Sequence, residues 1–193
     1  MPNYSPGLSA NSAVRYFLIK MTEKYWGKHN EKSKQGIKSW ADTRRFFQNK
    51  CAFCGKKKKL QKDHLRRLNK IDCGFHYPGN IVPACSNCNQ KGNDAETSWN
   101  SVLKTICDQN KEKSKFAERK NKILLFLQRH DHPSLSKNER MAIRVCAVSL
   151  HEGIKGQIES SEKFYEDVKN TLLGRSNPNS KKRNLSKNSK KKL

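Results

Sequence analysis

The chain has 193 residues, of which 34% are hydrophobic, and its 41 basic and 17 acidic residues give a formal charge of +24. A hydrophobic fraction below the ~45–50% of ordinary globular domains argues against one large apolar core. It predicts that some other feature helps to stabilise the fold. A charge surplus of this size repels itself unless a polyanion neutralises it. We therefore expect a nucleic-acid partner, whose phosphates release counterions when Lys and Arg replace them.

The sequence also limits the compartment. It lacks the ~18–20 consecutive apolar residues of a membrane span, so no membrane association is expected. Residues 1–12 show no basic region followed by an apolar run, so no signal peptide is expected there. We expect a cytoplasmic protein associated with DNA. In such a reducing compartment, closely spaced cysteines favour metal binding over disulfides.

Helical spacing dominates the N-terminal quarter. Residues 1–11, with Pro2, Pro6 and Gly7, are expected to form a turn-rich start. Residues 12–26 and 36–49 carry apolar side chains at intervals of three and four, which predicts two helices. The polar residues 27–35 between them are expected to form a loop. Residues 1–49 are therefore expected to be an N-terminal helical region.

Glycines and prolines interrupt the helical spacing from Cys51 to about residue 93, which predicts a hairpin, loops and a metal site within a core of residues 50–100. Helical spacing then returns across residues 101–173, where apolar stripes predict helices that form a small core. The stripes are Trp99, Leu103 and Ile106, then Phe116, Ile123, Leu124 and Leu127, then Met141, Val145 and Val148, then Ile158, Phe164 or Tyr165, Val168 and Leu172.

The last segment, residues 174–193, has a different composition. It holds eight basic residues, no acidic residue and almost no apolar one. Such a segment cannot bury enough surface to fold, so a disordered tail that grips phosphates is expected. A nuclear import signal is the alternative.

Two C-x-x-C pairs predict a structural zinc site. Two residues between cysteines let both thiolates of Cys51-Ala-Phe-Cys54, and of Cys85-Ser-Asn-Cys88, reach one ion from a tight turn. Gly55 permits the backbone that such a turn needs. A shell of four thiolates has no open position, so this zinc is expected to be structural. An iron–sulfur cluster and reactive thiols are the alternatives. Three further cysteines lack partners at ligand spacing: Cys73, Cys107 and Cys146.

Between the pairs lie Asp63-His64, then Gly79-Asn80-Ile81-Val82-Pro83, and the second pair is followed at once by Asn89. In type, order and spacing these residues, over about residues 40–100, resemble the HNH endonucleases of the ββα-metal group. The resemblance implies an α+β fold with a small ββα-metal core and a four-cysteine zinc site, flanked by N- and C-terminal helices. It implies a metal-dependent endonuclease that hydrolyses DNA phosphodiester bonds, such as a restriction, phage or mobile-element nuclease.

The resemblance also implies residue roles. The residues matching Asp63 and Asn89 hold one catalytic metal, the residue matching His64 activates water, and the residue matching Asn80 fixes the loop and helps to orient the base. The residue types agree with this chemistry. Imidazole titrates near neutrality, as a general base should, and the oxygens of Asp and Asn suit Mg²⁺ or Mn²⁺ better than zinc. His76, in the connecting loop, is an alternative base or a DNA contact.

Basic residues around this motif are candidate phosphate contacts, and a solvated surface is the alternative for each. Many HNH proteins place a lysine three residues after the final Asn, whereas Lys91 comes two after Asn89, which leaves the start of the metal-site helix uncertain by a residue. Double-stranded DNA is the expected partner, and a homodimer is left open. The candidate contacts are Lys56, Lys57, Lys58, Lys59, Arg66, Arg67 and Lys91.

A second hypothesis is a zinc-ribbon protein that binds nucleic acid without cutting it. The triplet Asp63, His64 and Asn89 distinguishes the two, because binding alone requires none of these side chains at those positions. A third, an RNA-associated structural protein, is compatible with the basic tail but explains neither the triplet nor the helices.

Overall fold

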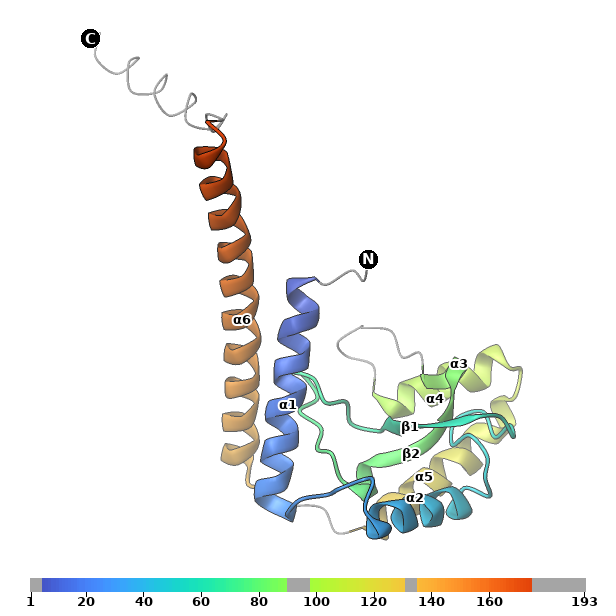
Figure 1. Ribbon diagram of the computed structural model, residues 1–193. Helices are drawn as coiled ribbons and strands as arrows, with labels where there is room; N and C mark the ends of the chain where they lie inside the picture. Colours follow the sequence, from blue (N-terminus) through green and yellow to red (C-terminus); the bar gives the residue numbers. More distant parts are fainter. Residues whose placement is uncertain (1–4, 90–97, 131–134, 175–193) are drawn as a thin grey trace, which may run out of the picture.

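The computed structural model describes residues 5–89, 98–130 and 135–174, and its fold is α+β, mostly helical with a two-stranded antiparallel sheet (Figure 1). This confirms the expected class at that level. The elements in chain order are α1 (Pro6–Trp26), α2 (Lys34–Phe46), β1 (Leu60–His64), a 3-10 turn (Pro78–Asn80), β2 (Ile81–Cys85), α3 (Ser86–Asn89), α4 (Trp99–Gln109), a second 3-10 turn (Lys113–Lys115), α5 (Phe116–Gln128) and α6 (Lys137–Leu172).

The first helix begins earlier than the sequence predicts. Residues 6–11 are helical, so the expected turn-rich start is wrong from Pro6 onwards. Ser5 is the N-cap, and its side chain accepts a hydrogen bond from the backbone N–H of Leu8. Proline is favoured in the first helical turn because the N–H it lacks would have no partner there. Pro6 is therefore the first residue of α1 and not part of a turn-rich segment.

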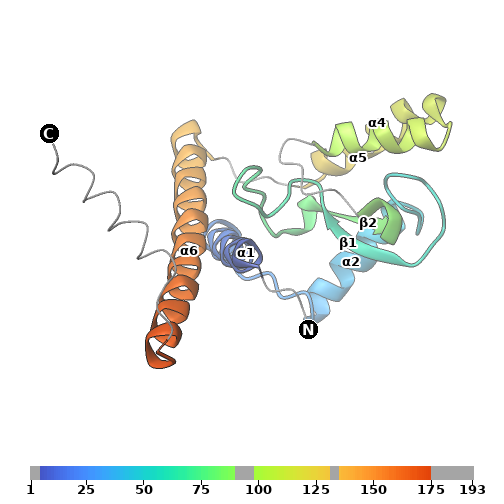
Figure 2. The ribbon, with the colours of Figure 1, turned by 90° about the horizontal axis from the view of Figure 1, so that it is seen from above.

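Helices α1 and α6 lie side by side and run in opposite directions (Figure 1, Figure 2). Val14 and Leu18 of α1 are buried against Ile143 and Ala147 of α6. At about 1.5 Å per residue, the 21 residues of α1 span about 31 Å and the 36 residues of α6 about 54 Å. The C-terminal part of α6 therefore extends beyond α1, and no residue of α6 after His151 is buried.

Helix α6 corrects two expectations. One continuous helix replaces the two expected over residues 141–172. The stripe of Met141, Val145 and Val148 is 57%, 58% and 38% exposed, so it does not form the expected core. Because α1 covers only one face of α6, the face that carries Ile143 and Ala147 is buried and the Met141 stripe faces outwards.

A second hydrophobic cluster joins the hairpin to α2, α4 and α5. Its largest buried side chains include Phe53, Leu103, Ile123 and Phe126, and the four cysteines of the two C-x-x-C pairs belong to it. A cluster of this modest size fits a fold that a bound metal helps to stabilise.

The sheet pairs β1 with β2 so that Leu60 lies opposite Cys85, Asp63 opposite Val82 and His64 opposite Ile81. Helix α3 follows β2 directly, which gives two antiparallel strands and then a short helix. This register places the end of β1, where the candidate active-site pair lies, beside the start of β2.

Two of the expected features lie outside the described residues: Lys91 and residues 175–193 of the basic tail. Within the described ranges, no helix combines the length and apolar character that crossing a bilayer requires.

Candidate metal centre and active site

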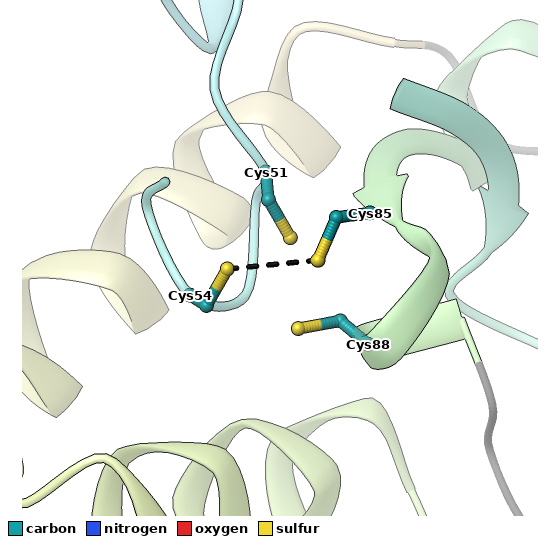
Figure 3. A group of neighbouring side chains, drawn as sticks. All are labelled: Cys51, Cys54, Cys85 and Cys88. Carbon is teal, nitrogen blue, oxygen red and sulfur yellow. Dashed lines mark hydrogen bonds between the residues drawn. The ribbon is translucent and has the colours of Figure 1, made fainter. Parts of the chain in front are cut away.

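Four cysteine side chains converge on one point (Figure 3). Their Sγ atoms all lie within 4.8 Å of one another. The residues are between 1% and 7% exposed. Cys54 Sγ and Cys85 Sγ are 3.8 Å apart, which is about the edge of a tetrahedron whose Zn–S bonds are about 2.3 Å long. The four residues therefore fit a single zinc ion, as their spacing predicts.

Local backbone geometry builds each half of this cluster. Gly55 has φ +70, the left-handed conformation expected of it, and its N–H donates to Cys51 O at 2.9 Å to close the first turn. The N–H of Ala52 donates to Pro83 O at 2.7 Å, which attaches this turn to β2. The second half needs no separate anchor because Cys85 ends β2 and Cys88 lies on α3.

The thiols interact strongly with one another. Hydrogen bonding from Cys51 and Cys88 lowers the pKa of Cys54. The hydrogen bond with Cys54 raises the pKa of Cys51 to about 11, and hydrogen bonds with Cys51 and then Cys54 raise the pKa of Cys88. Four buried thiolates would repel one another. Without a cation, the cluster can therefore hold one thiolate stabilised by its neighbouring thiols. A bound divalent ion replaces these protons.

The candidate base, His64, ends β1 and contacts a second imidazole. His64 Nε2 lies 3.0 Å from His76 Nδ1, and His76 Nε2 lies 3.2 Å from Glu31 Oε1. Burial lowers the pKa of His76, which favours its neutral ring. The tautomers of the two rings decide which of them donates in this contact.

The two candidate ligands of a catalytic metal come from adjacent elements. Asp63 is 7% exposed in β1, and side chains alternate along a strand, so it shares a face with Gln61. Asn89, at the end of α3, donates from Nδ2 to Gln61 Oε1 at 3.0 Å. Asn89 therefore lies over the strand face that carries Asp63, and its remaining amide atom, Oδ1, is the type of atom that Mg²⁺ or Mn²⁺ binds.

Asn80 fastens the loop between the strands. Its side chain is almost fully buried and makes three hydrogen bonds: it accepts from Arg66 N at 2.8 Å and donates to Arg66 O at 2.8 Å and Phe75 O at 2.7 Å. Its own carbonyl accepts from Leu65 N at 2.9 Å. These bonds hold the chain directly after His64, which supports the structural role that the resemblance implies.

We expect Asn80→Ala to lower the free energy of unfolding by at least about 3 kcal/mol, because each buried backbone group left without its partner costs about 1–3 kcal/mol. Urea denaturation of zinc-loaded protein measures this. Asn121→Ala, at an exposed position of α5, is the control and should change stability by less than about 0.5 kcal/mol. Equal stability of the two variants would show that the Asn80 bonds do not hold the loop.

The candidate phosphate contacts differ in availability. Lys56 to Lys59 are all exposed in the segment between the first cysteine pair and β1. Arg66 is exposed and lines a cavity of about 490 Å³ together with Arg140 and Arg144. Arg67 is turned inwards: its Nε lies 3.2 Å from Asp72 Oδ2, and its side chain is 16% exposed. Arg66 is therefore the better placed of the two arginines for a phosphate.

Sequence reasoning missed His29 and Glu31. Both lie in the segment between α1 and α2 that was expected to be only a polar loop, yet their ligand atoms lie within 4.8 Å of each other and of His76. The local pattern His-Asn-Glu was the only signal, and nothing in the spacing connects it to a histidine 47 residues further along the chain.

Comparison with known proteins adds no relative: no protein-family model, curated protein or solved structure matches this chain significantly. The HNH resemblance therefore stays a prediction that depends on the residues of the hairpin and of α3.

Proposed function

We propose that this protein is a metal-dependent DNA endonuclease of the HNH type. The observation that carries the proposal is the arrangement around the hairpin. Asp63 and His64 end β1, the four-cysteine cluster fixes β2 and α3, and Asn89 on α3 reaches across to β1. A histidine that directly follows an aspartate in β1, with Asn89 bonded to the same strand, on a rigid scaffold within a strongly basic chain, is suited to phosphodiester hydrolysis.

The proposed roles follow from the positions. His64 takes the proton from the attacking water, and its contact with His76 limits rotation of its ring. Asp63 and Asn89 are the residues that would hold Mg²⁺ or Mn²⁺, which supplies positive charge for the phosphoryl oxygens. Arg66 and Lys56 to Lys59, all exposed, are proposed to bind the phosphates of double-stranded DNA. Zinc at the four cysteines keeps the hairpin folded and takes no part in the chemistry.

One observation favours the second candidate, a zinc-containing nucleic-acid-binding protein without activity. His64 Nε2 contacts His76 and the Asn89 amide donates to Gln61, so these proposed catalytic side chains already make bonds within the protein. Catalytic hydrogen bonds often rearrange when the substrate binds, so these contacts alone do not exclude activity.

Incubation of the purified full chain with supercoiled plasmid distinguishes the candidates. We expect nicked or linear products with Mg²⁺ or Mn²⁺, none with EDTA, and recovery when Mg²⁺ is added back. Zinc content must be measured after the EDTA step, so that loss of the structural ion is not mistaken for loss of the catalytic one. Retardation of the plasmid without cleavage under every metal condition would favour the binding protein. Sequencing of the product ends then shows whether cutting is sequence-specific.

A further inference from the structure

A second group of metal-ligand side chains lies outside the four-cysteine cluster. His29, Glu31 and His76 each direct one ligand atom to a common point, and these atoms lie within 4.8 Å of one another. They come from the segment between α1 and α2 and from the loop between β1 and β2. We propose that these three residues bind a divalent first-row transition ion, with Zn²⁺ as the expected occupant, at a site separate from both the four cysteines and the Asp63–Asn89 pair.

Ligand chemistry supports this choice of ion. Two imidazoles and one carboxylate suit Zn²⁺, Co²⁺ and related ions, whereas Mg²⁺ prefers oxygen ligands alone. His76 Nε2 and Glu31 Oε1 are 3.2 Å apart, close to the ~3.3 Å that separates two ligands of a tetrahedral ion at ~2.0–2.1 Å. Three protein ligands leave a fourth position for water, unlike the closed shell of four thiolates.

The carboxylate is oriented for this role. Glu31 Oε2 pairs with Lys62 Nζ at 2.9 Å, while the other oxygen, Oε1, faces His76. An ion can therefore bind Oε1 without breaking the ion pair with Lys62. A partner that holds the second oxygen of a ligating carboxylate fixes its direction, as outer-shell groups do in metal sites.

The backbone of His76 is anchored to α1, so metal binding does not require it to move. The backbone N–H of His76 donates to Thr22 Oγ1 at 2.9 Å, and Thr22 is a buried residue of α1. A cavity of about 10 Å³, close to the least that one water molecule needs, is lined by His29, Glu31 and Lys62 but not by His76. A bound ion would fasten the connection between α1 and α2 to the loop that carries His76, one imidazole away from His64.

Cobalt binding to the full, untagged chain, with zinc already in the four-cysteine site, tests the proposal. With excess Mg²⁺ present to fill the proposed Asp63–Asn89 site, we expect one Co²⁺ per chain by calorimetry and metal analysis. Its absorption spectrum should lack the near-ultraviolet sulfur-to-cobalt charge-transfer bands that thiolate ligands produce. Zn²⁺ should displace it, and excess Mg²⁺ should not. The outcome is independent of DNA cleavage, so it stands or fails separately from the proposed function.

Variants make this assay specific. Glu31→Gln and His76→Ala should each weaken Co²⁺ binding by at least about 10-fold. The matched controls Glu162→Gln, on the exposed part of α6, and His151→Ala should leave it unchanged. Zinc content and circular dichroism identify any variant that fails to fold, and Glu31→Gln, nearly the same shape as glutamate, remains informative if His76→Ala misfolds. Absence of any bound Co²⁺ in the zinc-loaded wild type, or equal affinity in Glu31→Gln and Glu162→Gln, would overturn the proposal.

Discussion

Cys88→Ser is expected to yield protein that lacks zinc and is largely unfolded or insoluble. Cys88 is 7% exposed and belongs to the same hydrophobic cluster as Phe53 and Phe126, so the metal and the apolar side chains stabilise one unit. Structural zinc supplies about 10–16 kcal/mol of apparent binding free energy in small domains, which exceeds the stability of most folds. Zinc analysis together with thermal unfolding followed by circular dichroism measures both effects.

The chain offers a matched control, Cys146→Ser, because Cys146 is an exposed cysteine of α6. That variant should keep about one zinc per chain at the four-cysteine site and unfold at the wild-type temperature. A Cys88→Ser protein that remains folded without zinc would show that the four cysteines are not a structural metal site.

His64→Ala is expected to slow DNA cleavage by about 10²–10⁴-fold, the usual cost of losing a general base. Folding and zinc binding should survive, because His64 is only half-buried and the proposed zinc ligands are the four clustered cysteines. DNA binding should also survive, since it depends on exposed lysines and arginines. Nicking of supercoiled plasmid and a gel-shift assay on the same zinc-loaded preparation separate the two properties.

His151→Ala is the control for His64→Ala, because it removes a histidine of α6 that contacts Lys70 and Glu152 and no residue of β1 or β2. Wild-type cleavage by His64→Ala would contradict its assignment as the base and make His76, its neighbour at 3.0 Å, the next candidate. Simultaneous loss of DNA binding and zinc would instead make His64 a structural residue and favour the binding protein.

Sequence predicted what short-range spacing determines. The cysteine cluster follows from two C-x-x-C turns, and Gly55 adopts the positive φ that such a turn requires. The mostly helical character could also be read from intervals of three and four. The helices and each half of the cysteine cluster need only neighbouring residues to specify them, which is why they can be read from a single sequence.

Tertiary packing determined the rest. Periodicity identified Met141, Val145 and Val148 as apolar but could not tell that α1 covers the opposite face of α6. His29 and Glu31 meet His76 only because the loop after α1 returns to the hairpin, an arrangement that spacing along the chain does not encode. The sequence alone could not show which of Arg66 and Arg67 is available for a phosphate. The ion pair between Arg67 and Asp72 shows that Arg67 is the less available.

The central question is whether β1 carries a catalytic metal beside a separate structural zinc. Plasmid nicking by wild type and Asp63→Ala, measured against Mg²⁺ concentration, tests this most directly. Both proteins should contain equal zinc at the four cysteines. Wild-type nicking should rise and saturate with Mg²⁺, and Asp63→Ala should need far more Mg²⁺ or show no nicking at all, because a carboxylate oxygen ligand is lost. Absence of nicking by zinc-loaded wild type at every Mg²⁺ concentration, or identical curves for the two proteins, would contradict the proposed endonuclease.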